Sequence, residues 1–171
     1  MKKLTKVLFL LVLAIGINYG AFAQTLKIGY VDSSDIMQIM PERTKVEQDL
    51  QTYYGELQAE LQAMYAEYQN KIKDYEANMN TMSNLVRQSK EKEIMDLQSR
   101  IQEFQGNAET ALDEKRMELL TPLIEKIQNA VNAVGKEKGF TYILDKSTGA
   151  VVYFGDDATD ITPDVKKKLG L

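Results

Sequence analysis

Apolar side chains recur along residues 46–79 at steps of four, three and four residues. This pattern occurs three times in succession, so its period is eleven residues, or about 3.67 residues per helical turn. Such a stripe stays nearly straight along a helix, whereas a seven-residue repeat winds into a left-handed coiled coil. The spacing predicts one long helix with a single apolar face. The stripe comprises Val46, Leu50, Tyr53, Leu57, Leu61, Met64, Tyr68, Ile72, Tyr75 and Met79.

A second helical pattern follows after an interruption at residues 78–84, where the sequence NMNTMSN is rich in residues that favour caps and turns. Apolar residues then recur at helical spacing from Ile94 to Val134, and the pattern stops where Gly135 and Gly139 flank a Lys-Glu-Lys triplet. Two long helices joined by a short turn predict an antiparallel hairpin. Each helix of about 40 residues would be about 60 Å long.

We therefore expect a helical arm over residues 41–122, with its tip near residues 78–84. Folding the chain back at this tip places Pro41 opposite Pro122, which mark the base of the arm, and Gly55 opposite Gly106. Because glycine lowers helix stability, these two glycines together predict a hinge within the arm.

Short strand patterns lie on both sides of the arm. Residues 26–32 alternate and predict a strand, and residues 33–35 cap a short helix that ends before Pro41. Residues 140–145 and 150–154, joined by a Lys-Ser-Thr-Gly turn, predict a β-hairpin, and Thr162 with Pro163 starts a final helix. The fold class is α+β and mainly α, with the arm projecting from a small body formed by residues 24–40 and 123–171. A body of this size is marginal alone and leaves strand edges open, so it predicts oligomerisation through the strands.

The first 23 residues have the features of a secretory signal peptide. Lysines precede an apolar run, and Ala21-Phe22-Ala23 offers the small residues of a cleavage site. We expect cleavage between Ala23 and Gln24, which deepens the net charge from −4 to −7. An uncleaved membrane anchor is the alternative, although the run is shorter than the ~20 residues that a spanning helix needs. Because the chain has no cysteine, we do not expect a lipoprotein.

The composition excludes most familiar catalytic chemistry. The chain has no cysteine and no histidine, so it holds no Cys–His or Ser–His nucleophile, disulfide or thiolate–imidazole zinc site. The acidic residues at 156–164 do not follow the calcium-loop pattern, and no phosphate-binding glycine loop is present. The net negative charge disfavours nucleic acid. We expect that the protein is not an enzyme and that it binds no cofactor and no metal ion.

The candidate binding residues are apolar side chains beside the stripe or at the tip of the arm. Tyrosine and methionine adapt to varied apolar partners, although the same residues could instead complete the seam between the helices. The arm is acidic, with nine basic and fifteen acidic residues between positions 44 and 120, and a basic group follows the tip at Arg87, Lys90 and Lys92. This group is either a solvated helix face or a weak contact with anionic lipid headgroups. The candidate binding residues are Tyr54, Tyr65, Met79, Met82, Leu85 and Val86.

The order of these parts resembles the Skp/OmpH family of periplasmic chaperones. The resemblance rests on IGYVDSSDIM at residues 28–37, I-x-x-A-V-x-x-V-x-K-E-K-G-F-T-Y-I-L-D at 127–145 and DITPDV at 160–165, with the long hairpin between the first two. It implies a homotrimer in the periplasm whose arms extend like tentacles and hold unfolded outer-membrane proteins without ATP. It also assigns the strand segments to the trimer body. The residues so assigned are Ile28, Tyr30, Val31, Tyr142, Ile143, Leu144, Val151, Val152 and Tyr153.

The acidic arm departs from the strongly basic tentacles of well-known family members, so the resemblance alone does not extend the family's electrostatic attraction of clients and lipopolysaccharide to this chain, and binding of lipopolysaccharide or membrane stays open. A structural envelope spacer or adaptor that docks through the hairpin tip is the alternative function. The body is small for such an adaptor, because adaptors carry larger β domains beside their hairpins.

Overall fold

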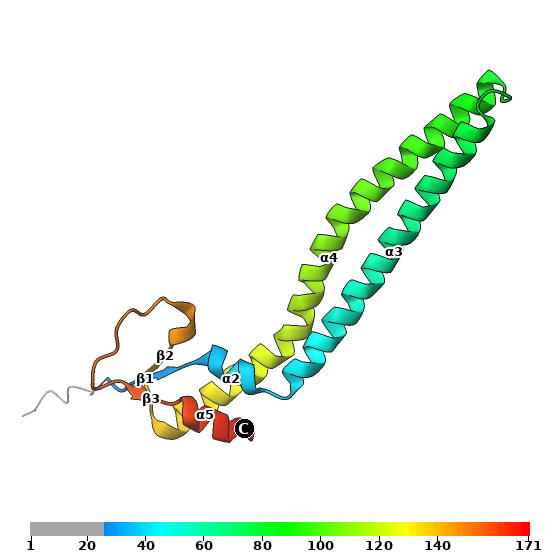
Figure 1. The fold of residues 1–171 in the computed structure, drawn as a ribbon. Coiled ribbons are helices and arrows are strands. Elements are labelled where there is room, and N and C mark those ends of the chain that lie inside the picture. Colours follow the sequence, from blue (N-terminus) through cyan, green and yellow to red (C-terminus); the bar gives the residue numbers. More distant parts are fainter. Residues whose placement is uncertain (1–25) are drawn as a thin grey trace, which may run out of the picture.

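Two long helices project as an arm from a small body (Figure 1). The computed structural model describes residues 26–171, so the predicted signal peptide and its cleavage site lie outside the described residues. The arm consists of α3 (Glu42–Asn78) and α4 (Asn84–Lys138), which run antiparallel. This architecture confirms the predicted α+β, mainly α, fold with a projecting helical hairpin.

The body contains a three-stranded sheet in the order β2-β1-β3. These strands are β1 (Ile28–Val31), β2 (Tyr142–Asp145) and β3 (Thr159–Asp160), and β1 pairs in parallel with both neighbours. The predicted β-hairpin is wrong: residues 150–154 form no strand, and β2 is followed by the 3₁₀ turn η1 (Lys146–Thr148). The hydrogen bonds expected between the hairpin strands are made by β1 instead, which pairs Ile28 with Tyr142 and Val31 with Asp145.

The parallel pairing explains how the arm is attached to the body. Parallel neighbours cannot be joined by a tight turn and need a crossover connection, commonly a helix. Here α2 (Ser33–Ile39), α3 and α4 together form the connection between β1 and β2. The arm is therefore an extended crossover, and both of its ends are fixed on the same sheet.

Both long helices follow their predicted apolar patterns. On α3, every stripe residue from Val46 to Tyr75 is buried or half-buried, and only Met79, past the helix end, is exposed. The helix α4 begins after Ser83, whose hydroxyl accepts a hydrogen bond from the Val86 amide. It ends at Gly139, which adopts the left-handed conformation that glycine favours. The helix continues through Pro122, so the predicted boundary between arm and body is not a break in secondary structure.

Caps in the body differ by one residue from the sequence prediction. Asp32, rather than one of the predicted residues 33–35, caps α2, because its carboxylate accepts a hydrogen bond from the Asp35 amide at 2.8 Å. The last helix, α5 (Thr162–Leu169), has proline in its first turn as predicted and ends at Gly170 in the left-handed conformation.

The apolar core is divided into two clusters. The larger one lies in the body, where α4 packs against the sheet, α2 and α5, and it extends into the base of the arm at Val46. The smaller one lies in the distal arm and consists of Met64, Leu97 and Ile101, flanked by half-buried residues. The arm is thus held to the body at one end and by its own short seam farther out. The buried residues of the body core are Val31, Ile36, Met40, Val46, Leu123, Ile127, Ala130, Val131, Val134, Ile161 and Val165.

The register of the two arm helices differs from the one predicted for a simple fold-back. Near the tip, Lys71 Nζ lies 3.1 Å from Glu93, close to the expected level. Farther down, the Gln105 amide donates to the Tyr65 hydroxyl at 3.2 Å, so Gly106 lies beside the level of Tyr65 and does not face Gly55. The two glycines therefore occupy staggered levels, and the predicted pairing between them is wrong.

Replacing Leu97 with alanine is expected to destabilise the distal arm by about 2–5 kcal/mol, because it removes a fully buried side chain from the smaller cluster. Amide hydrogen exchange should accelerate in residues 61–68 and 94–104, while the body remains protected. The exposed Met95→Ala on the same helix is the matched control, for which we expect little change. Equal acceleration in both variants would contradict the two-cluster description.

Candidate functional site

One face of the sheet is apolar and only thinly covered within residues 26–171. Side chains alternate along the strands, so Val31 and Ile143 point toward the helices of the body, and the Ile143 side chain packs close to Gly135. Ile28, Tyr30, Tyr142 and Leu144 occupy the opposite face, where Tyr142 and Leu144 are exposed. The structure thus divides the residues predicted for oligomerisation between an inner and an outer face.

The segment after β2 carries the most exposed apolar side chains of the body. Val152 is 97% exposed and Tyr153 is 80% exposed. The neighbouring Phe154 packs on the outer face of β1, where its ring lies 4.4 Å from that of Tyr30. Val151 is half-buried. The outer sheet face and this segment both carry accessible apolar side chains, and the Tyr30–Phe154 contact connects them.

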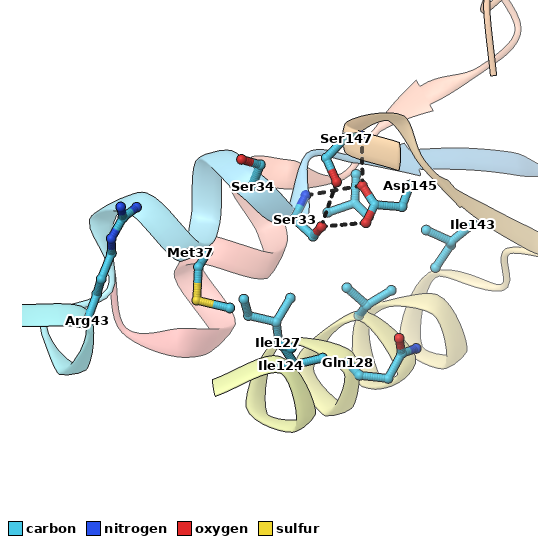
Figure 2. A pocket seen from close by; sticks show the side chains of 12 residues that line it. Ser33, Ser34, Met37, Arg43, Ile124, Ile127, Gln128, Ile143, Asp145 and Ser147 are labelled. Carbon is cyan, nitrogen blue, oxygen red and sulfur yellow. Dashed lines mark hydrogen bonds between the residues drawn. The ribbon is translucent and has the colours of Figure 1, made fainter. Parts of the chain in front are cut away.

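A cavity of about 320 Å³ lies between α2, α4 and the sheet (Figure 2). Ser33, Asp145 and Ser147 point toward one another on one side of it, and Met37 and Ile127 lie on the other. The Asp145 carboxylate accepts hydrogen bonds from the Ser33 amide at 3.3 Å, from the Ser147 amide at 2.9 Å and from the Ser33 hydroxyl. These bonds join the start of α2 to the end of β2. We refer to Ser33, Asp145 and Ser147 as the serine–aspartate latch.

The latch is suited to holding structure rather than to catalysis. Partial burial raises the pKa of the Asp145 carboxyl, but hydrogen bonds from Ser33 and Ser147 outweigh that effect and leave the pKa below its ordinary value. A carboxylate with a lowered pKa is a weak base, and no imidazole is available to activate Ser33. Within residues 26–171, no group of three acidic side chains is arranged to hold a metal ion.

The candidate binding residues on the arm are largely accessible. Tyr54 and Tyr65 are each 43% exposed although they adjoin the apolar seam. At the tip, Leu85 is 79% exposed, and Met79 and Val86 are also exposed, whereas Met82 is half-buried. Tyr54, Tyr65, Leu85 and Val86 are thus accessible, Met82 is less accessible than its place at the tip predicts, and the role of all these residues in binding stays a prediction.

A groove opens between the two helices in the middle of the arm. It lies between the body core and the distal cluster, where α4 bows away from α3 (Figure 1), and its volume is about 410 Å³. Apolar side chains from both helices form most of its lining, with Gln58, Gln105 and Glu109 at its margins. This volume falls within the range of common ligand pockets. The apolar lining residues are Tyr54, Leu57, Leu61, Phe104, Ala108 and Leu112.

Ion pairs across the distal arm neutralise part of its basic charge. Lys71 Nζ lies 3.1 Å from Glu93, and Lys90 Nζ lies 3.7 Å from Asp74. Arg87 donates to the Asn84 side chain at 2.7 Å. Of the basic group predicted past the tip, Lys90 is therefore engaged with the facing helix. Within the described chain, no helix is long and apolar enough to cross a membrane.

The family model described as "Outer membrane protein (OmpH-like)" matches residues 27–169. The chain belongs to the Skp/OmpH family. This match extends from the first strand to the last helix and confirms the resemblance on which the sequence analysis relied. The Skp/OmpH family is a family of chaperones.

Skp/OmpH relatives match across most of their length. The chain is 31% identical over 147 residues to the chaperone protein Skp of Pectobacterium atrosepticum, covering 84% of this chain and 85% of that protein. It is 30% identical over 148 residues to Skp of Blochmanniella pennsylvanica. A crystal structure of an OmpH-like outer membrane chaperone from Caulobacter crescentus superposes with a TM-score of 0.68, covering 84% of this chain and 83% of that one. At 16% identity, this structural likeness establishes the fold alone.

Sequence reasoning missed two features of this Skp/OmpH chain. The latch joins residues 112 positions apart, so only its local half was visible: an aspartate two residues before a serine is typical of a turn in which the carboxylate accepts the later amide. The groove had no sequence signal, because its lining residues follow the same periodicity as the tightly packed residues on either side.

Replacing Asp145 with asparagine is expected to lower the free energy of unfolding by about 1–3 kcal/mol at neutral pH, because the latch loses a charged acceptor. Since the folded-state pKa lies below the unfolded-state value of about 3.9, the carboxylate stabilises the fold above that value. This contribution is lost as the pH falls through the lower, folded-state pKa. Denaturant unfolding at pH 7 and pH 3 should therefore show a difference from the wild type that shrinks in acid.

The exposed Asp157→Asn, in the loop before β3, is the control for the loss of one carboxylate. Its unfolding free energy should follow the wild type at both pH values. An Asp145→Asn variant whose deficit stays constant between pH 7 and pH 3 would show that the charge of the latch does not contribute.

Proposed function

We propose that this protein is an ATP-independent periplasmic holdase that binds unfolded outer-membrane proteins between its arms and prevents their aggregation. The observation that carries the proposal is the arm itself, whose apolar groove and exposed tyrosine and tip residues lie far from any body that could cover them. Relatives at about 30% identity are named chaperone protein Skp. A holding surface of this kind needs no reactive side chain and no nucleotide site.

We further propose that the chain acts as a homotrimer assembled through the body. The accessible outer face of the sheet and the exposed segment at Val152 and Tyr153 supply apolar area that association would remove from water. Within residues 26–171 the sheet also has two unpaired edges, because β1 is its central strand. Association through these edges and this face leaves the arms free to surround a client.

Binding in such a cavity is multivalent. Each exposed tyrosine, methionine or leucine offers a weak apolar contact, but many contacts around one client raise the effective concentration of binding sites. Retention is then strong although every single contact exchanges quickly. The client can still fold when its own apolar surfaces compete successfully for one another.

Electrostatic attraction of acidic clients has a small part in this mechanism. The arm carries fifteen acidic and nine basic residues between positions 44 and 120. At the tip, the pairing of Lys90 with Asp74 reduces the charge available to anionic lipid headgroups. Any contact of the tip with a membrane surface is accordingly weak and sensitive to salt.

The holdase is tested by diluting a urea-unfolded outer-membrane β-barrel into buffer with the mature protein and following light scattering. We expect suppression of scattering at a stoichiometric amount of trimer. Leu85→Ser should require a larger molar excess for the same suppression, because it removes the most exposed apolar side chain of the tip. Gln88→Ser, on the next turn of the same helix, is the control and should match the wild type.

Failure of the wild-type protein to suppress scattering would contradict the holdase function and favour the alternative function as an envelope spacer. Equal suppression by wild type and Leu85→Ser would retain the holdase but exclude the tip from client contact.

The staggered glycines also predict a flexible arm. A Cβ atom added at Gly55 or Gly106 would meet no neighbour within 4 Å, so alanine fits at both positions without a clash. Each substitution should stabilise its helix by up to about 1 kcal/mol and restrict bending. Spin labels on a cysteine introduced at the tip are clean probes, because the chain has none of its own.

We expect a narrower distribution of tip-to-tip distances in the double variant Gly55→Ala/Gly106→Ala than in the wild type. Ala59→Gly, on the same helix, should broaden the distribution. An unchanged width in the double alanine variant would exclude the glycines as hinge residues.

A further inference from the structure

The two sides of the arm differ in charge. On α3, the side chains next to the apolar stripe on the side of the groove are all uncharged between residues 51 and 69. They follow one another at steps of three or four residues, so they line up along the helix. All of them are exposed. These residues are Gln51, Tyr54, Gln58, Gln62, Tyr65 and Gln69.

The helix α4 extends the same surface. Gln98, Gln102 and Gln105 are exposed and lie at steps of four and three residues. Gln105 lines the groove, and its amide donates to the Tyr65 hydroxyl at 3.2 Å across the two helices. We call these three glutamines, together with the six α3 residues, the uncharged face. At its end toward the body, Glu109 is the first charged residue in the groove lining.

Beside residues 51–69 of α3, the opposite side of the arm carries the charges, whereas toward the body Glu47 and Arg116 lie next to Gln51 and Tyr54. On α3, Glu56, Glu60 and Glu67 lie on the other flank of the apolar stripe. Ion pairs cluster there, and Lys71 lies within 4 Å of both Glu67 and Glu93. We call this surface the charged face. Charges on any side of the arm would make it soluble. Because they are concentrated on the charged face, the uncharged face is available to bind another molecule.

We propose that the uncharged face lines the client cavity and binds unfolded polypeptide through its main-chain amides and apolar side chains, whatever the charge of the client. This inference rests on the proposed holdase function and names the surface and the chemistry that it uses. The groove of about 410 Å³ receives apolar side chains of the bound segment. The glutamines and tyrosines around it contact the backbone of the same segment.

The side chains of the uncharged face suit an unfolded backbone. A glutamine side chain offers both a donor and an acceptor, as a peptide group does, so it can replace water at either end of an exposed peptide. Tyrosine adds a large apolar ring with a polar tip. Neither residue requires the removal of a charge from water, which is expensive without an opposite charge in the partner. Every unfolded chain carries the same backbone, so this chemistry accepts many sequences.

Site-directed crosslinking tests which face meets the client. Single cysteines at Gln58→Cys and Glu60→Cys lie two residues apart on opposite sides of the stripe, and the chain has no competing thiol. Each purified variant is labelled with a photoactivatable maleimide and loaded with a urea-unfolded outer-membrane β-barrel by dilution. We expect client crosslinks from position 58 and far fewer from position 60.

Equal yields from both positions, or a higher yield from position 60, would overturn the inference. Crosslinks from position 58 to a second copy of the chain in place of the client would also overturn it. Suppression of light scattering by the same labelled variants distinguishes this failure from failure of the proposed function. If the unlabelled wild type also does not suppress scattering, the proposed holdase function is wrong.

Charge independence is tested with two peptides that share one apolar segment and end in either lysines or glutamates. We expect the wild-type affinities for the two peptides to agree within about threefold at physiological salt. Gln58→Glu with Gln62→Glu should weaken binding of the glutamate-ended peptide about tenfold, because it places charge on the uncharged face. The matched pair Glu56→Gln with Glu60→Gln, on the charged face, should change binding less than about twofold.

Far-UV circular dichroism of both pairs establishes that the helices are retained. A wild-type preference of more than tenfold for either peptide would overturn charge independence. A larger effect from the charged-face pair than from the uncharged-face pair would overturn the assignment of the face.

Discussion

The packing of the last third of α4 against the parallel sheet is the interaction on which the rest of the structure depends. Leu123, Ile127, Val131 and Val134 lie on one side of this helix and are buried in the body core. The same helix continues without a break to the tip of the arm. The core therefore fixes the position of α4, and the direction of the arm follows from it. Pairing of β1 with β2 anchors both ends of the crossover that contains the arm.

This constraint leaves the middle of the arm without support from the body. There the two helices have only each other to pack against, and their contact is tight in two places rather than along the whole length. The groove is what remains between these places. The groove therefore follows from the small size of the body and the length of the arm. A larger body would be needed to cover more of the seam between the two helices.

In the proposed holdase, the two faces of the arm separate solubility from binding. Beside residues 51–69 of α3, acidic side chains and ion pairs lie on one side, while glutamine and tyrosine lie along the groove on the other, with Glu109 at its end toward the body. A surface that meets many unfolded chains gains from neutrality, because a fixed charge would favour some clients and repel others. A net acidic arm is compatible with holding acidic clients if the charges point away from them. This arm then differs from the basic tentacles of well-known family members in the position of its charges as well as in their sign.

The sequence by itself determined the elements that depend on local periodicity and turn chemistry. The eleven-residue stripe located α3, the lapse at residues 78–84 located the tip, and Gly135 with Gly139 located the end of α4 to within about one turn, because each signal arises from neighbours along the chain. Only the tertiary structure decided the partner of β2, the latch between Ser33 and Asp145, and the level at which Gln105 meets Tyr65. These contacts join residues 40 to more than 100 positions apart, and a strand of four residues carries no local signal for its partner. The groove belongs to the same class, since it depends on the separation of two helices rather than on the residues of either one.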